Sequence, residues 1–231
     1  MWLLAVDTST RDASVALLRD DCLVACVATP GDVQHSVQLF RDIERALSQA
    51  GCKLADIDVY AVASGPGAFT ALRVGLTTIK ALAEMHSKPV VPVSVLEAVC
   101  ERATAHGLLV PIVDAYRGQV FGGVYEKTSD DILCRQPERV LTLDEFLASL
   151  ARDGVDPRAC TLVSPYLERL ASRLAQLPVA WTGQEQVSAV LGDAIARRAR
   201  AKLARGQVTD ALRLEANYVR RSDAELLWKP K

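Results

Sequence analysis

Apolar and polar positions along the chain fall into short blocks, and the blocks follow one another in a repeating order. Apolar runs of strand length alternate with stretches in which apolar residues recur every three or four positions, as on one face of a helix. Alternation of this kind is typical of an α/β protein with a mainly parallel sheet. The first half predicts strands at 2–6, 13–18, 22–28, 58–63 and 89–95, and helices at 35–51, 71–83 and 96–105.

The second half of the chain predicts the same layout. Thr142 and Glu145 have the spacing of a capping box, and apolar residues recur at four-residue steps along the last helix. Two halves of the same order predict an internal duplication, with an N-terminal subdomain at 1–105 and a C-terminal subdomain at 106–231 whose last segment can pack back on the first. The apolar blocks indicate strands at 108–113, 119–125, 132–140 and 159–163, and helices at 142–150, 166–175 and 187–205.

A glycine-rich motif links the fourth predicted strand to a helix. It reads Gly-Pro-Gly-Ala-Phe-Thr-Ala-Leu-Arg-Val-Gly and runs from Gly65 to Gly75. Gly67 permits close approach of a neighbour, and Thr70 is placed to cap the helix. Free N–H groups at such a helix start suit a phosphate or a carboxylate. A tight turn in which Gly75 admits a neighbouring helix explains the same residues, and the spacing leaves both interpretations open.

Known phosphate-binding signatures do not match this motif. No Gly-Lys-Ser/Thr follows, so it is not a Walker loop, and Thr70 stands where a dinucleotide fingerprint has its third glycine. The motif followed by an apolar helix instead resembles the signature of the bacterial TsaB family, also called YeaZ. The resemblance extends to Asp-Ala-x-Arg at 114–117 and to Tyr-Val-Arg at 218–220, and it covers nearly the whole chain.

This resemblance implies a fold, a function and partners. The implied fold is α/β, the two-domain duplicated actin-like ATPase (ASKHA, ribonuclease H-like) fold. The implied function is that of a non-catalytic subunit that pairs with a TsaD-like catalytic subunit, which transfers threonylcarbamoyl to the adenosine beside the tRNA anticodon. The other implied partners are a TsaE-like ATPase, tRNA bound through the complex, and a second copy of the chain in a homodimer when TsaD is absent.

The segment after the fifth predicted strand bears on catalysis. In TsaD the corresponding line runs Val-Asn-His-x-Glu-Gly-His, with two metal-binding histidines, whereas residues 93–99 here read Val-Ser-Val-Leu-Glu-Ala-Val. Val95 and Val99 therefore stand at the ligand positions, and aliphatic side chains cannot coordinate a metal. His86 and His106 show no ligand spacing that compensates. We expect no catalytic residue, no metal and no cofactor.

The first predicted strand ends in a polar turn that resembles the first phosphate loop of actin-like ATPases. In that pattern a glycine usually follows the Asp, and Thr8 replaces it here. A polar turn held together by its own Asp explains the turn equally well. The alternative function is therefore an actin-like ATPase or a nucleotide-binding regulatory protein. The candidate nucleotide site, weak or vestigial, consists of Asp7, Thr8, Ser9, Gly65, Gly67 and Thr70.

Two helices of the first half carry a candidate partner surface. One face of each helix must cover the sheet, and a remaining face of small and apolar residues lets another helix approach. The resemblance implies that this surface pairs with the same region of TsaD, whereas the alternative is that its residues serve the internal core. The candidate residues are Val37, Phe40, Ala71, Val74, Gly75 and Thr78.

Composition narrows the remaining choices. The 231 residues carry a net charge of −1, which predicts no general affinity for nucleic acid or for a membrane surface. No secretory leader or apolar span is evident, and six cysteines without metal spacing predict reduced, buried thiols in a cytoplasmic protein. A metalloprotease lacks its His-Glu-x-x-His here. From residue 197 onward ten Lys or Arg face four Asp or Glu, and we expect a solvated basic helix face there rather than a tRNA contact.

Overall fold

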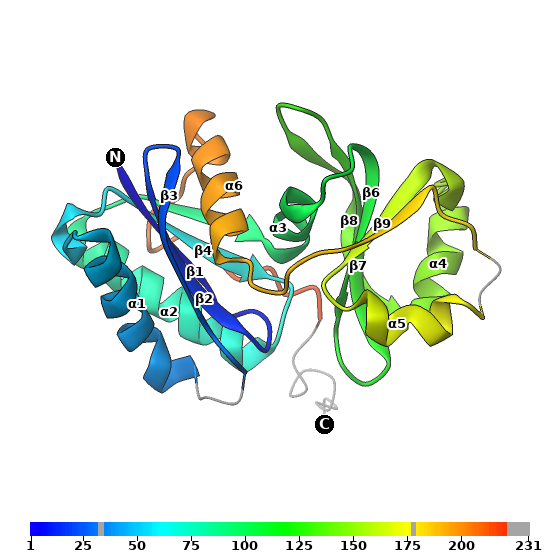
Figure 1. The fold of residues 1–231 in the computed structure, drawn as a ribbon, viewed down its shortest axis with the longest axis horizontal. Helices are drawn as coiled ribbons and strands as arrows, with labels where there is room; N and C mark the ends of the chain where they lie inside the picture. The colour runs from blue at the N-terminus through cyan, green and yellow to red at the C-terminus, as the bar shows by residue number, and fades with distance from the viewer. Residues whose placement is uncertain (32–34, 177–178, 221–231) are drawn as a thin grey trace, which may run out of the picture.

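The computed structural model describes residues 1–31, 35–176 and 179–220, and the side chains of residues 35 and 36 lie outside what it describes. Two five-stranded sheets face each other across the molecule (Figure 1). The first has the order β3-β2-β1-β4-β5 and the second the order β10-β9-β6-β7-β8. The strands are β1 (Trp2–Asp7), β2 (Ala13–Arg19), β3 (Cys22–Thr29), β4 (Val59–Gly65), β5 (Val90–Ser94), β6 (Gly107–Asp114), β7 (Gln119–Lys127), β8 (Ile132–Thr142), β9 (Cys160–Ser164) and β10 (Gly183–Gln186).

The two sheets repeat one topology. In each, the first strand pairs antiparallel with the second and parallel with the fourth, so β1, β2 and β4 correspond to β6, β7 and β9. Short polar turns join the antiparallel strands, and helices make the crossovers that parallel pairs require. The predicted α/β fold of two duplicated, actin-like halves is confirmed.

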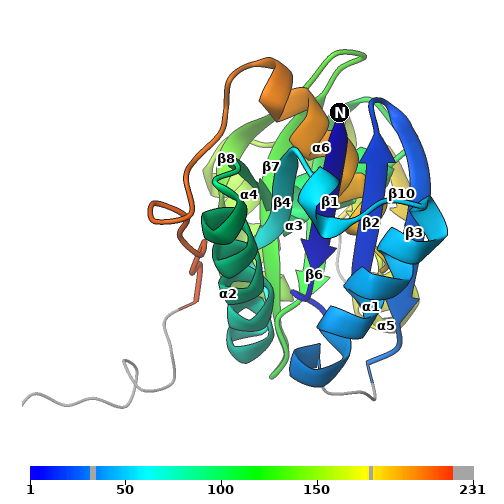
Figure 2. The same ribbon diagram turned by 90° about the vertical axis from the view of Figure 1, so that its left-hand side faces the viewer.

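Helices cover both faces of the sheets. α1 and α2 lie on the outer face of the first sheet (Figure 2), and α4 and α5 lie on the outer face of the second (Figure 1). The helices are α1 (His35–Ala50), α2 (Phe69–His86), α3 (Val95–Arg102), α4 (Leu143–Arg152), α5 (Leu167–Leu174) and α6 (Gly192–Ala204), with 3-10 turns at Leu54–Asp56 and Pro157–Ala159. No helix of the described ranges is long and apolar enough to cross a membrane.

The two helices between the sheets are exchanged. α6 follows the second sheet in the chain but packs on β1 and β2 of the first, whereas α3 follows the first sheet and packs mainly on β6 and β7 of the second (Figure 1). α3 and α6 also pack against each other, and one apolar cluster contains buried residues of both sheets. The division into subdomains at residue 105 stays a prediction, since the interior is continuous across it.

The basic residues of α6 are held by carboxylates. Arg198 is 4% exposed and donates from Nε and Nη2 to Glu97 Oε1 at 3.0 and 2.6 Å, while Lys202 Nζ donates to Glu97 Oε2 at 2.8 Å. Burial opposes the charge of Arg198, but Glu97 raises the pKa of its guanidinium, as does Asp131. A buried cation requires such partners. The expectation of a solvated basic face is therefore wrong for Arg198.

Arg197 and Arg200 of the helix and its C-cap residue Arg205 also have partners. Arg205 contacts Asp131, Arg200 lies 3.2 Å from Asp21, and Arg197 lies 3.9 Å from Asp193. Pairs this exposed contribute little to stability, about 0–1 kcal/mol each. They nevertheless offset part of the local excess of positive charge on α6.

Several predicted boundaries are corrected by local chemistry. The predicted helix at 187–205 begins only at Gly192, because residues 187–191 form the connection from β10 and Val187 N still donates to Ser164 O beside β9. β10 was not predicted, since its polar sequence Gly-Gln-Glu-Gln carries no strand signal. α2 begins at Phe69 with Ala68 as its N-cap, so Thr70 lies inside the first turn and does not cap the helix. The capping box of Thr142 and Glu145 is confirmed at the start of α4.

The prediction of buried thiols holds for only some of the cysteines. Cys100 and Cys160 are buried, and burial raises the pKa of the Cys100 thiol well above its ordinary value. Cys22, Cys26 and Cys134 are exposed, which corrects the prediction for those three. None of these five is in a disulfide.

Candidate functional site at the glycine motif

The turn after β1 is fastened to helix α2 by one hydroxyl group. Thr8 Oγ1 donates to Ala71 O at 2.6 Å and accepts from Gly75 N at 3.2 Å. In a regular α-helix the N–H of residue 75 points at the carbonyl of residue 71, so the hydroxyl bridges two groups of the helix's own ladder. A Cβ on Gly75 would lie 2.5 Å from Thr8 Oγ1. The last glycine of the motif is therefore needed to admit Thr8.

The remaining polar groups of this turn bond to one another and to the motif. Asp7 Oδ1 accepts from Ser9 N at 2.8 Å and from Ser9 Oγ at 2.6 Å, and Ala68 N donates to Ser9 O at 3.0 Å. A Cβ on Gly67 would lie 2.5 Å from Ser9 O. Asp7, Thr8 and Ser9 are all buried, so these three predicted nucleotide ligands lie beside the motif but present almost no surface to a ligand.

The corresponding turn of the second sheet lies across a narrow gap. Tyr116 and Asp114 of this turn, Ser9 of the first and Tyr166 at the start of α5 line a cavity of about 30 Å³. That volume has room for one or two water molecules. Pockets for small-molecule ligands span roughly 300–1,000 Å³, so the space between the two turns is too small for a nucleoside triphosphate.

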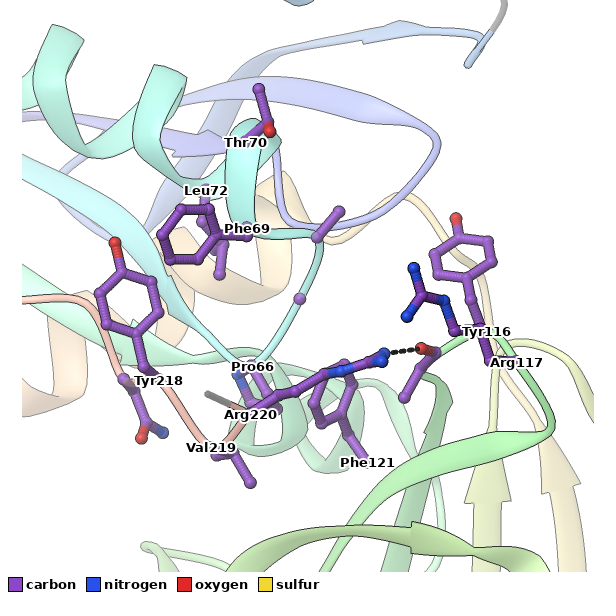
Figure 3. Close-up of a pocket in the computed structure, with 14 residues that line it drawn as sticks. Pro66, Phe69, Thr70, Leu72, Tyr116, Arg117, Phe121, Tyr218, Val219 and Arg220 are labelled. Carbon is purple, nitrogen blue, oxygen red and sulfur yellow. Dashed lines mark hydrogen bonds between the residues drawn. The ribbon is translucent and has the colours of Figure 1, made fainter. Parts of the chain in front are cut away.

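A larger cavity of about 470 Å³ lies on the other side of the glycine motif (Figure 3). We call it the motif cavity. Three segments that are distant in sequence form its wall: the motif itself, the turn after β6 with the start of β7, and the C-terminal segment. Its lining residues are Pro66, Gly67, Ala68, Phe69, Thr70, Leu72, Ala115, Tyr116, Arg117, Phe121, Asn217, Tyr218, Val219 and Arg220.

The C-terminal segment lies directly on the first glycine of the motif. Asn217 N donates to Ser64 O at 2.7 Å, and the Asn217 side chain contacts Glu138 of β8. Gly65 has φ +122°, and a Cβ there would lie 2.6 Å from Asn217 O. The absence of a side chain at Gly65 therefore allows the C-terminal segment to pass close to the motif.

Aromatic and basic residues of the motif hold the same segment. The rings of Phe69 and Tyr218 lie 5.0 Å apart, the Arg73 guanidinium lies 3.9 Å from the Phe69 ring centroid, and Arg73 Nε donates to the Tyr218 hydroxyl at 3.1 Å. Arg220 continues across the cavity and donates to Ala115 O at 3.2 Å (Figure 3). Sequence reasoning missed these contacts, although Tyr218 and Arg220 belong to the recognisable Tyr-Val-Arg ending.

The candidate partner residues divide into two groups. Val37 and Phe40 on α1 are 55% and 54% exposed, and Ala71 and Val74 on α2 are partly exposed. Thr78 is only 7% exposed, and Gly75 packs on Thr8. The structure corrects the placement of Thr78 and Gly75, which lie in the interior and offer no open surface to a partner.

The positions that bear on metal binding lie in the core. Val95 and Val99 of α3 are fully buried in the apolar cluster between the sheets. Within the described parts of the chain, no group of three or more His, Cys, Asp or Glu side chains could hold a metal ion. Asp114 Oδ1 accepts from Tyr116 N at 2.8 Å within its own turn, and Arg117 is exposed at the rim of the motif cavity.

These features define an α/β protein of two duplicated, ribonuclease H-like halves in which the first phosphate-type turn is closed and a larger cavity opens beside it. A family model described as TsaD, tRNA N6-adenosine threonylcarbamoyltransferase, matches residues 31–214. The chain belongs to this family. It is also similar to proteins named TsaB and YeaZ.

Two curated relatives carry the name tRNA threonylcarbamoyladenosine biosynthesis protein TsaB. The protein of Bacillus subtilis is 34% identical over 151 residues, and that of Escherichia coli is 29% identical over 135 residues. These alignments cover 65% and 57% of this chain, and they span only 66% and 58% of the relatives' own length.

Solved structures extend the likeness of fold to nearly the whole chain. YeaZ from Pseudomonas aeruginosa has a TM-score of 0.77 at 23% identity, covering 94% of this chain and 99% of that one. A second Pseudomonas aeruginosa protein, described as similar to peptidase YeaZ, has a TM-score of 0.80 at 24% identity, covering 95% and 99%.

Proposed function

We propose that this protein is a non-catalytic subunit for the formation of threonylcarbamoyladenosine in tRNA, and that it pairs with and supports a TsaD-like transferase. The names of its Bacillus subtilis and Escherichia coli relatives support the pathway. The observation that carries the non-catalytic role is the pair Val95 and Val99. Both are buried aliphatic side chains at the positions where the TsaD motif has its metal-binding histidines.

The apolar surface of the first half supports the pairing. Val37 and Phe40 are large apolar side chains more than half exposed on α1, and the partly exposed Ala71 and Val74 lie on α2, which packs against α1. Exposed apolar surface of this kind commonly marks a protein interface. We propose that the TsaD-like subunit covers it, and that a second copy of the chain does so when that subunit is absent.

The wider assembly follows from the same proposal. A TsaE-like ATPase and tRNA join the pair, and the assembly works in the cytoplasm without a cofactor on this subunit. Closure of the turn at Asp7 and Thr8 disfavours the alternative of an independent actin-like ATPase, because the first phosphate loop of that class must leave its backbone N–H groups open to phosphate.

Reconstitution tests the proposal. The purified chain, the TsaD-like and TsaE-like proteins of the same genome, tRNA and threonylcarbamoyl-adenylate are mixed, and each protein is left out in turn. We expect labelled threonine in tRNA only when this chain and the TsaD-like subunit are both present. Transfer by this chain alone, or full transfer without it, would contradict the proposal.

A pair of variants separates the interface from general instability. Phe40→Glu places a charge on the exposed apolar surface of α1 and should weaken pairing with the TsaD-like subunit by about tenfold or more, as loss of a buried aromatic anchor does. Ala151→Glu adds the same charge at an exposed helical position of the second half and should leave pairing unchanged. Equal affinities for the two variants would rule out this surface.

A further inference from the structure

The motif cavity differs in charge from the rest of the molecule. The chain as a whole has a net charge of −1, yet the described residues that line the cavity include two arginines, Arg117 and Arg220, and no Asp or Glu. Arg220 is one of the basic residues counted from position 197 onward, whereas Arg117 comes from the turn after β6. The described wall of the cavity thus presents two guanidinium groups and no carboxylate side chain.

Aromatic rings are concentrated in the same wall. Phe69, Tyr116, Phe121 and Tyr218 are four of its fourteen lining residues, although aromatic residues make up only 5% of the chain. Tyr116 and Tyr218 are about half exposed, whereas Phe121 is buried and forms part of the cavity's floor. Two large rings thus remain open to solvent at the rim.

The rings and the guanidinium groups are spread across the cavity. Figure 3 shows Phe69 and Tyr218 at one end and Tyr116 with Arg117 at the other, while Arg220 extends between them below the glycine motif. A flat ligand can stack on a tyrosine at either end while an anionic group meets an arginine. Rings suited to stacking and guanidinium groups that bind phosphate are the combination by which proteins hold unpaired nucleotides.

Other anionic ligands fit this wall less well. An acidic peptide would use the arginines but leave the exposed rings without a role. Double-stranded nucleic acid keeps its bases stacked inside the helix, out of reach of Tyr116 and Tyr218. A volume of about 470 Å³ admits a nucleotide turned out of a loop.

We propose that the motif cavity binds unpaired nucleotides of an RNA loop. The rings of Tyr116 and Tyr218 stack on bases, and Arg117 and Arg220 contact the backbone phosphates. This inference rests on the proposed function, which supplies tRNA as the RNA. It assigns direct RNA contact to this subunit and places that contact at the cavity beside the glycine motif.

Fluorescence anisotropy with the intact chain tests the inference. The probe is a labelled RNA hairpin that carries a tRNA anticodon loop. Tyr116→Ala should weaken binding by about tenfold because one base no longer stacks. Arg117→Ala should reduce the slope of log affinity against log salt by about 0.7 for each phosphate that the arginine neutralises in the wild type. Arg213→Ala removes an exposed arginine outside the cavity and should leave affinity and slope unchanged.

Two outcomes would overturn the inference. One is equal affinity of the wild type, Tyr116→Ala and Arg117→Ala for the hairpin, with folding of each verified by circular dichroism. The other is binding of free adenosine monophosphate as tight as that of the hairpin, which would make the cavity a site for free nucleotides.

The Phe40→Glu variant keeps this inference separate from the proposed function. It should lose the TsaD-like subunit but bind the hairpin like the wild type, because Phe40 lies on α1, outside the cavity. Hairpin binding at the cavity by a chain that does not support transfer would refute the proposed function alone. Support of transfer without hairpin binding would refute this inference alone.

Discussion

The turns that follow β1 and β6 occupy the same place in the two halves and share one hydrogen bond. Asp7 Oδ1 accepts from the N–H of Ser9, and Asp114 Oδ1 accepts from the N–H of Tyr116, both at 2.8 Å. Each Asp thus closes its own turn by bonding the backbone two residues on. The strand ends and this first hydrogen bond are the same in both halves.

The next residue makes the two turns different. Thr8 reaches into the ladder of α2, whereas the side chain of Ala115 has no polar atom to do so. One position further on, Ser9 is 2% exposed and Tyr116 is 54% exposed. A single hydroxyl, with a glycine opposite it, makes the first turn part of the core and leaves the second to line a cavity.

Gly75→Ala tests the closed turn most strongly. The new Cβ would overlap Thr8 Oγ1, and we expect a loss of about 2–3 kcal/mol in the free energy of unfolding, although alanine favours a helix. Urea denaturation followed by circular dichroism measures it. Gly183→Ala is the control, because its Cβ would meet neighbours only at 3.6 Å.

Adding Thr8→Ala to Gly75→Ala should restore most of that stability, because the hydroxyl oxygen that collides with the new Cβ is then absent. The packing of Thr8 on Gly75 does not keep the first turn closed if Gly75→Ala is as stable as the wild type. The same holds if the double variant is no more stable than Gly75→Ala alone.

Ser9→Ala and Tyr116→Ala compare the two turns at equivalent positions. Ser9→Ala removes a donor from the buried carboxylate of Asp7 and should lower the free energy of unfolding by about 1–2 kcal/mol. Tyr116→Ala changes an exposed side chain and should stay within about 0.5 kcal/mol of the wild type. Equal losses in the two variants, measured by urea denaturation, would contradict the difference between the turns.

The narrow gap between the turns can be tested through Tyr166. Burial, and next the charge of Asp12, raise the pKa of the Tyr166 phenol above its ordinary value of 10.0. A raised pKa in the folded state means stability that is present below pH 10 and declines as the pH rises through the folded pKa. Absorbance titration of the wild type minus Tyr166→Phe should show this phenol ionising above pH 10. Ionisation at its ordinary pKa would mean that water enters the gap.

The smallest signal is expected when the isolated chain is tested for binding of ATP. With Asp7 Oδ1, the Thr8 hydroxyl and Ser9 engaged, isothermal calorimetry on the isolated chain should detect weak binding or none. Submicromolar affinity that Tyr116→Ala leaves unchanged would contradict the closed state of the first turn.

Local pattern sufficed for most of the fold, because strand and helix periods are properties of neighbouring residues. The site depends on contacts that no local pattern contains. Thr8 and Gly75 are 67 residues apart, and Arg73 and Tyr218 are 145 apart. A turn, a helix start and a tail could each be recognised from the sequence, but which of them touch is decided by how the two sheets face each other.

The charge predicted for α6 was wrong for the same reason, because it was counted from neighbouring residues alone. Counting residues from 197 onward indicates a basic face, but Glu97, the carboxylate that pairs with the buried Arg198, stands 101 residues earlier in the chain. Local counting therefore overstates the charge that α6 presents to solvent. The predicted exposure of Thr78 and Gly75 was wrong for a related reason. Helical spacing does not tell which small residues of a helix a neighbouring segment will cover.

The exchange of α3 and α6 has a consequence for how such a chain can be made. While a ribosome is still producing the second half, the first sheet lacks the helix that covers its inner face, and that face stays open to water until residues 192–204 have emerged. An ancestor of half this length, with one such sheet, would have had the same uncovered inner face. The helix of a second copy could have covered it in a homodimer. Fusion of two such copies into one chain would make that dimer intramolecular, and the two turns would no longer need to be alike.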